Sequence, residues 1–332
     1  MHCRFPIADS RLEIANRKSK IENREFPRAL LLGALACVSW STVFVLGRMV
    51  IRVGTDPVVL GLYRFGLSGL ILTGLMAAMG RGRALGAFAR EPLAFLLLGL
   101  TGGFAMGFFV FLALQYTHSI VVQIIMNSNP VLIVPLSLLV GERVGIGKVA
   151  GVGLGVVGCV LVLSGAGVPP ASLELAGKMP APPRSENHLV GGVLAALSAL
   201  SWAVYTVFGR GVVRRHGGLT ATTVSMVLGG LFFFVACVLL GKNLILGWQG
   251  AVAGLFLAVV PTVFGFTAWY VALEELPANV LGPLQFIVPV GGVALAVVLL
   301  GERLTLAMAV GGVVALAGVY LSTREGHRRL KA

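Results

Sequence analysis

One charged side chain lies well inside an apolar stretch of this sequence. Arg64 belongs to GLYRFG, residues 61–66, and follows Pro57 by about 10 Å of helix. A charge within a membrane span is costly and usually faces protein or water. Two interpretations stay open. Arg64 binds the carboxylate of a small substrate, or its long side chain reaches the membrane surface or loop carbonyls.

Amide side chains gather in a second stretch, QIIMNSNP, residues 123–130. Gln123 and Asn127 are four residues apart and share one face of a helix. Pro130 frees a backbone carbonyl one turn earlier and loosens the helix there. The stretch therefore either offers donors and acceptors to a polar or zwitterionic substrate, or holds neighbouring helices together.

A similar stretch, GPLQFIVP, occupies residues 282–289. Gln285 precedes Pro289 within another apolar run, and its amide could serve the same purpose as those of the first stretch. We expect Pro130 and Pro289 to break their helices and to act in gating.

Aromatic residues form the third group of candidates. Trp40 and Trp202 lie well inside apolar runs, away from the membrane interface where tryptophan is most frequent. Tyr205 shares a helix face with Trp202 because it follows three residues later. Each could stack on a substrate, or pack between helices with its polar atom on a carbonyl. Trp269 and Tyr270 are further candidates, although we expect one of them to face lipid.

The composition places these residues in a membrane. Of 332 residues, 57% are hydrophobic and 12% are charged, whereas soluble proteins carry roughly 25% charged residues. The mean hydropathy is +0.93. Apolar runs of about 20 residues mark transmembrane helices, and the sequence predicts ten of them: 29–50, 57–79, 92–114, 119–140, 146–166, 189–209, 221–241, 251–272, 279–300 and 305–322.

The basic residues predict the orientation of these spans. Nineteen of the 26 Lys and Arg residues fall in segments on one side of the membrane if the N-terminus is cytoplasmic, and six fall on the other. The positive-inside rule then places both termini in the cytoplasm of a bacterial-type inner membrane. Basic loops against anionic lipid also explain the net charge of +13, so we expect no nucleic-acid partner.

The sequence contains an internal repeat of about 160 residues. SWSTVFVLGR at 39–48 returns as SWAVYTVFGR at 201–210, and GER at 141–143 returns at 301–303. Each copy holds five predicted spans. An odd number inverts the second copy in the membrane, and inverted repeats are typical of secondary transporters, with the substrate site between the repeats near the midplane.

The duplicated motifs resemble one known family. A Trp in the first helix, Ala-Leu near the end of the third, a Pro in the fourth and GER before a glycine-rich fifth helix occur in order in both halves. Over residues 29–323 the chain resembles the EamA branch of the drug/metabolite transporter superfamily. The resemblance implies an all-α membrane fold of ten helices in two inverted repeats, with helices one to four of each half around a cavity. It also implies transport of amino acids, other metabolites or drugs, often outward. The spacing from Pro to Glu differs by one residue between the halves, so the symmetry there is imperfect.

The predicted domains follow the repeat. They comprise a disordered cytoplasmic tail at 1–28, the first repeat at 29–166, a proline-rich linker at 167–188, the second repeat at 189–323 and a basic cytoplasmic tail at 324–332.

The sequence favours secondary transport of small metabolites, with export ahead of uptake. A membrane-embedded enzyme is the alternative of another class, and the sequence shows no catalytic cluster, metal-ligand spacing or cofactor motif for one. Related small multidrug pumps use an intramembrane carboxylate to carry protons, whereas no Asp or Glu lies deep in a predicted span here. Proton coupling, if present, would use Glu274, Glu275 or His118 near helix ends, or Tyr and water; simple facilitated transport or exchange is equally open. The sequence leaves the oligomeric state open.

Overall fold

The computed structural model describes residues 7–117, 119–142, 144–165, 187–300 and 305–331, and every regular element in these ranges is a helix. The first repeat comprises α1 (Ile7–Arg52), α2 (Pro57–Ala78), η1 (Gly82–Gly86), α3 (Ala87–Arg90), α4 (Pro92–Leu98), η2 (Gly99–Ala105), α5 (Met106–Tyr116), α6 (Ser119–Asn127), α7 (Pro130–Leu139) and α8 (Ile146–Gly165).

The second repeat follows the same order without the short helices η1 and α3 and with one additional short helix, η4. It comprises α10 (His188–His216), α11 (Gly218–Leu239), α12 (Trp248–Leu257), η3 (Ala258–Phe264), α13 (Gly265–Glu275), α14 (Ala278–Leu281), η4 (Gly282–Phe286), α15 (Ile287–Leu300) and α16 (Leu306–Lys331). Together the two repeats form an all-α membrane fold.

Seven helices in the described residues are long and apolar enough to cross a membrane. Each matches a predicted span. The predicted spans 119–140 and 146–166 contain shorter apolar helices, at Ile125–Leu139 and Ile146–Leu161. The predicted span 279–300 is divided among α14, η4 and α15. The fourth span of each repeat is therefore interrupted, between α6 and α7 in the first repeat and at η4 in the second.

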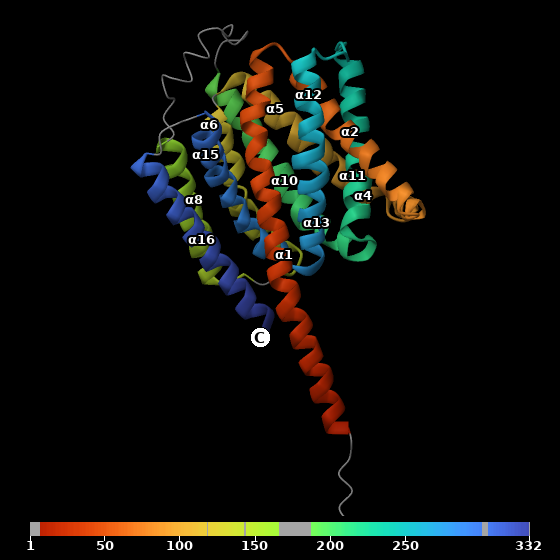
Figure 1. Cartoon of the computed structure of the whole chain (residues 1–332), viewed down its shortest axis with the longest axis vertical. Coiled ribbons are helices and arrows are strands. Elements are labelled where there is room, and N and C mark those ends of the chain that lie inside the picture. Colours follow the sequence, from red (N-terminus) through yellow and green to blue (C-terminus); the bar gives the residue numbers. More distant parts are fainter. Residues whose placement is uncertain (1–6, 118, 143, 166–186, 301–304, 332) are drawn as a thin grey trace, which may run out of the picture.

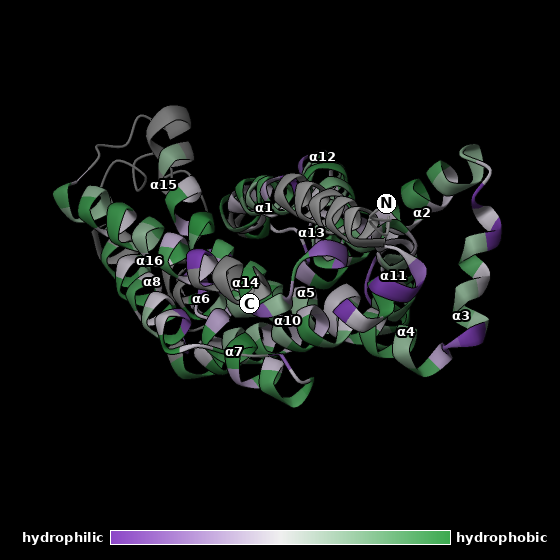
Figure 2. Cartoon of the chain, turned by 90° about the horizontal axis from the view of Figure 1, so that it is seen from below, coloured by the Kyte–Doolittle hydropathy of each residue, from purple (hydrophilic) through white to green (hydrophobic). Residues whose placement is uncertain are grey.

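The two repeats run in opposite directions through the bundle. In Figure 1, α1 rises from the lower end and α8 ends at the upper end, where α10 begins; α16 then descends to the C-terminus at the lower end. Seen from below in Figure 2, both chain ends face the viewer. We call the lower end of Figure 1, which carries both chain ends, the termini end of the bundle.

The first helix is longer than its predicted span. The sequence predicts a disordered tail over residues 1–28, whereas the structure extends α1 back to Ile7 and projects this part beyond the bundle (Figure 1). The segment is rich in Glu, Lys and Arg, which are good helix formers.

Equivalent helices of the two repeats pack against each other. The fifth spans, α8 and α16, lie together at one side of the bundle, and α2 packs along α11 (Figure 2). Small residues allow this: a Cβ at Gly158 would meet the backbone of Ala315, and one at Gly69 would lie 2.9 Å from Val227 Cα. Close backbone approach at glycine is the usual way for membrane helices to associate.

Polar and charged groups fasten the helix ends. At the end opposite the termini, Asp56 caps α2 by accepting the Val58 N–H at 2.8 Å, and it pairs with Lys242 at 2.7 Å. At the termini end, Glu91 accepts two bonds from Arg215 and lies 3.1 Å from His216. Most of the described charges thus lie where water or lipid headgroups can solvate them.

Candidate functional site

Trp40 of α1 and Trp202 of α10 meet at the centre of the bundle. Their ring centroids are 5.0 Å apart with the rings nearly perpendicular, and Phe266 of α13 lies 5.7 Å and 5.3 Å from them. Edge-to-face contacts of this kind are favourable for aromatic rings. The repeated Ser-Trp motif thus places one tryptophan from each repeat in a single cluster.

The third span of each repeat contains a π-helical turn at the same position. These turns are η2 and η3, and their bounds are 159 residues apart at both ends. In η3, Pro261 has no N–H, so the carbonyl of Leu257 lacks its usual backbone donor. The Thr262 hydroxyl donates to this carbonyl at 2.7 Å instead. π-Helical turns are rare and often lie at functional sites.

The two tryptophans differ in their hydrogen bonds to these turns. Trp40 donates its indole N–H to the carbonyl of Pro261 at 2.8 Å. The indole N–H of Trp202 is buried and has no acceptor among the described residues. The repeat is therefore symmetric in sequence at this point and asymmetric in its bonding.

The neighbouring aromatic residues lie behind this pair. Tyr205 and Tyr270 stack at 4.5 Å, and Tyr270 donates to the Tyr205 carbonyl at 3.1 Å. Trp269 and Tyr270 are both fully buried. The expectation that one of them faces lipid is wrong, because α13 lies inside the bundle, in contact with α1, α10 and α11.

A cavity of about 50 Å³ lies beside the tryptophan pair. Its wall combines polar and aromatic side chains with aliphatic ones, and the polar and aromatic residues are Trp40, Phe44, Arg64, Asn127, Asn129, Trp202, Phe266 and Gln285. Ligand pockets are usually several hundred Å³. The space here suits a few water molecules, so a metabolite would enter only if the surrounding helices moved apart.

Arg64 is buried in the wall of this cavity and is 2% exposed. Its Nε donates to the Thr262 hydroxyl oxygen at 2.9 Å, and its guanidinium carbon lies 4.8 Å from the centre of the Phe65 ring. Cation–π contact of this kind stabilises a guanidinium where water is scarce. The guanidinium pairs with no carboxylate in the described part of the chain. The prediction that Arg64 reaches the membrane surface is wrong, because Thr262 and Phe65 hold it inside the bundle.

The break in the fourth span brings amides to the cavity. α6 ends at Asn127 and α7 begins at Pro130, and the Asn127 amide donates to the Gln123 carbonyl at 2.8 Å. Gln123 is buried outside the cavity wall. Asn129, which follows in the same turn, contacts Gln285 of η4 through its amide at 2.5 Å.

The prolines of the two fourth spans lie at similar places. Pro130 is the first residue of α7, and Pro289 lies in the first turn of α15 just after the 3₁₀ turn η4. In both repeats an irregular turn precedes the proline by no more than three residues, next to the cavity.

Three functional candidates escaped the sequence reasoning. Thr262 binds Arg64 of the cavity wall, and Asn129 lines the cavity itself. Of these two, Asn129 alone had a visible signal, the polar run before Pro130. Lys148, which resembles a loop residue in the sequence, is buried at the start of α8 and donates to the Asn279 side chain. Sequence spacing alone could not reveal these contacts because each joins distant helices.

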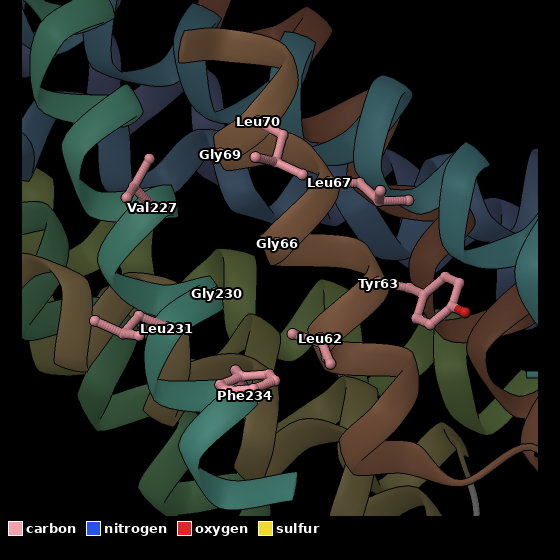
Figure 3. A pocket seen from close by; sticks show the side chains of 10 residues that line it. All are labelled: Leu62, Tyr63, Gly66, Leu67, Gly69, Leu70, Val227, Gly230, Leu231 and Phe234. Carbon is pink, nitrogen blue, oxygen red and sulfur yellow. The ribbon is translucent and has the colours of Figure 1, made fainter. Parts of the chain in front are cut away.

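A second hollow lies on the outer face of the bundle, between α2 and α11 (Figure 3). It measures about 350 Å³. Tyr63 carries the polar side chain of its lining, and Leu62 and Phe234 approach each other across it (Figure 3). A metabolite site needs several convergent polar groups, so the inner cavity is the better candidate.

The same two-repeat pattern defines a family of known proteins. The EamA-like transporter family matches the chain twice, at residues 27–164 and 189–324. The chain belongs to the EamA-like transporter family. The two matches lie on either side of the proline-rich segment and coincide with the two sets of helices described above. The chain is therefore a membrane transporter.

Several relatives align over nearly the whole chain. An uncharacterized transporter of Archaeoglobus fulgidus is 29% identical over 90% of this chain and 98% of that protein. A probable amino-acid metabolite efflux pump of Salmonella typhimurium is 28% identical, over 88% and 93%. The aromatic amino acid exporter YddG of Ancylobacter novellus is 27% identical, over 90% and 98%. A solved crystal structure shares the fold with a TM-score of 0.72 at 24% identity, over 90% of this chain and 99% of that one.

Proposed function

We propose that this EamA-like protein is a secondary transporter that exports small metabolites bearing a carboxylate, with amino acids as the first class to test. The observation that carries this proposal is the buried guanidinium of Arg64 in the wall of the cavity, without a carboxylate partner in the described part of the chain. A buried charge is costly unless it is paired, and a substrate carboxylate would pair it.

The names of the relatives support the choice of substrate class and direction. They include a probable amino-acid metabolite efflux pump, an aromatic amino acid exporter and a threonine/homoserine exporter. Uptake by the same fold is the second candidate. We propose that Trp40, Arg64, Asn127, Trp202 and Gln285 contact the substrate.

Behind this wall, we propose that Gln123, Tyr205 and Trp269 support the contact residues. Pro130 and Pro289 would allow the fourth span of each repeat to bend during alternating access.

The environment of the protein is part of the same proposal. We propose a bacterial-type inner membrane with both termini cytoplasmic, and two repeat domains at 29–166 and 189–323. The Arg64 charge at the site disfavours lipophilic cations as substrates, because like charges repel. Proton coupling, if present, would use titratable groups near the helix ends, or Tyr and water.

The test is transport by the purified protein in liposomes loaded with labelled amino acids. Arg64→Ala should raise the KM roughly 10- to 150-fold, the equivalent of about 1.5–3 kcal/mol for hydrogen bonds to a charged group. Arg64→Lys keeps the charge but loses the planar fork, so it should give an intermediate value. Arg81→Ala, in the exposed loop after α2, is the matched control.

Normal transport by both Arg64 variants would refute the carboxylate contact. Direction can be measured separately, by mass spectrometry of the medium from cells that express the chain or a variant lacking both Trp40 and Arg64. A metabolite enriched in the medium only by the intact chain supports export, and one depleted from it supports uptake.

A further inference from the structure

Two amide side chains from different repeats form a pair in the wall of the cavity. Asn129 lies in the turn between α6 and α7 and is 1% exposed, and Gln285 lies in η4 and is 4% exposed. Both line the same cavity as Arg64. The pair therefore joins the irregular turns of the two fourth spans at the place where a substrate would bind.

The hydrogen bonds fix which atoms of the pair remain free. The Asn129 Nδ2 group donates to the Met126 carbonyl at 2.7 Å and to Gln285 Oε1 at 2.5 Å. Turning the Asn129 amide over would place its oxygen against two acceptors. Turning the Gln285 amide over would place two donors together. The amide nitrogen and oxygen have similar shapes, but the hydrogen bonds of this pair allow only one orientation for each side chain.

The remaining atoms of the pair are an acceptor and a donor. Asn129 Oδ1 and Gln285 Nε2 are buried, and neither has a hydrogen-bond partner among the described residues. Leaving buried polar atoms unpaired costs free energy. Because both residues line the cavity, we infer that a substrate that opens it would supply one donor and one acceptor to these two atoms.

The chemistry of the complementary group follows from these two atoms. A carboxylate only accepts and an ammonium only donates, whereas a hydroxyl or a carboxamide does both. We propose that the Asn129–Gln285 pair selects substrates that carry an uncharged hydroxyl or carboxamide group in addition to their carboxylate. This inference rests on the proposed function, in which Arg64 binds the carboxylate.

Pairs of amino acids with nearly equal shape provide the test. Threonine and valine differ by a hydroxyl in place of a methyl group, and glutamine and methionine differ by a carboxamide in place of an apolar end. We expect the wild-type protein in liposomes to transport threonine and glutamine with the higher kcat/KM. A site built for a hydroxyl or amide rejects an analogue lacking it because its own polar groups stay unpaired.

Gln285→Met removes the free donor, and with it the oxygen that accepts from Asn129, while nearly keeping the volume. The threonine-to-valine and glutamine-to-methionine ratios of kcat/KM should each fall roughly 3- to 10-fold, which corresponds to the loss of one neutral hydrogen bond. Gln249→Met, at an exposed position in α12, is the matched control and should keep both ratios. Gln285→Leu repeats the test if the methionine variant does not fold.

The outcomes separate this inference from the function on which it rests. Equal kcat/KM within each pair for the wild-type protein, or unchanged ratios in Gln285→Met, would overturn the role of the amide pair alone. Arg64→Ala should weaken transport of all four amino acids to a similar degree. Folded wild-type protein that transports none of the four would overturn the proposed function and this inference together.

Discussion

Glu142 fastens the termini end of the bundle, and its removal should open that end. Its Oε1 accepts the Ala278 N–H at 3.1 Å and lies 3.3 Å from Arg210 Nη1, and its Oε2 accepts the Asn279 N–H at 3.1 Å. The Arg210 Nε also donates to the Leu276 carbonyl at 3.2 Å. One carboxylate from the first repeat thus holds the first turn of α14 and the end of α10.

The structure sets the size of the expected effect. Glu142→Gln keeps one acceptor oxygen and turns the other into a donor, which then faces a backbone N–H. The variant loses at least one charge-assisted hydrogen bond, and hydrogen bonds to charged groups contribute about 1.5–3 kcal/mol each. The Glu142 side chain is 7% exposed, so solvent screens the interaction little. A loss of about 2 kcal/mol corresponds to roughly a 30-fold larger open population.

The assay is the labelling rate of a cysteine at position 278 by a soluble thiol reagent, in a background without the native cysteines. Ala278 is fully buried in this structure, so labelling reports opening of the termini end. Glu142→Gln should accelerate labelling about 30-fold. Arg81→Gln, at an exposed charged residue in the loop after α2 at the same end, is the matched control and should leave the rate nearly unchanged.

A double-mutant cycle with Arg210→Met tests the mechanism. Because Glu142 and Arg210 contact each other, their effects should not add, and the coupling should lie within about 0.5–3 kcal/mol. The reasoning is refuted if Glu142→Gln labels at the wild-type rate, or if the two substitutions act independently.

Three further outcomes are expected from thermal unfolding in detergent. Gly158→Val forces a side chain into the backbone of α16 and should cost about 1–3 kcal/mol, whereas Gly153→Val faces open space and should cost far less; equal losses would contradict the packing argument. Trp40→Phe removes the hydrogen bond to the Pro261 carbonyl and should cost about 0.5–1.5 kcal/mol for that bond. Trp202→Phe should cost less, because its indole N–H has no partner among the described residues. The reverse order would exclude this bonding. The Arg215 hydrogen bonds lower the pKa of Glu91 in the folded protein below its ordinary 4.5. The Glu91 carboxylate therefore contributes its full stabilisation above pH 4.5 and loses it as the pH falls through the pKa of the folded state. Glu91→Gln should remove this part of the pH dependence of unfolding, and an unchanged profile would show that the contact does not form.

Much of the fold could be predicted because it follows from patterns along the sequence. Apolar runs mark the spans, and the repeat of Ser-Trp and GER marks two halves with the same order of helices. These patterns need no knowledge of distant contacts, since burying a span in lipid depends on its own composition. The tryptophan pair could also be predicted, because the repeat and the inversion together bring equivalent residues to one centre.

The site could be predicted only in part. Arg64, Asn127 and Gln285 were visible as polar residues within apolar runs. The pairing of these residues was not visible in the sequence, because Thr262 is 198 residues from Arg64 and Asn129 is 156 residues from Gln285. Sequence patterns report what a residue is and which helix face it shares, whereas a hydrogen bond between helices depends on how those helices cross.

The sequence by itself determined that this chain is a membrane protein with two inverted repeats and a few polar residues within its apolar runs. Only the tertiary structure decided that the Arg64 guanidinium stays inside, that Glu142 binds the opposite repeat through α14 and Arg210, and that the amide pair leaves one donor and one acceptor free. The physical reason is the same in each case. Hydropathy and repetition act along the chain, whereas burial and pairing of polar groups are settled only when distant helices pack.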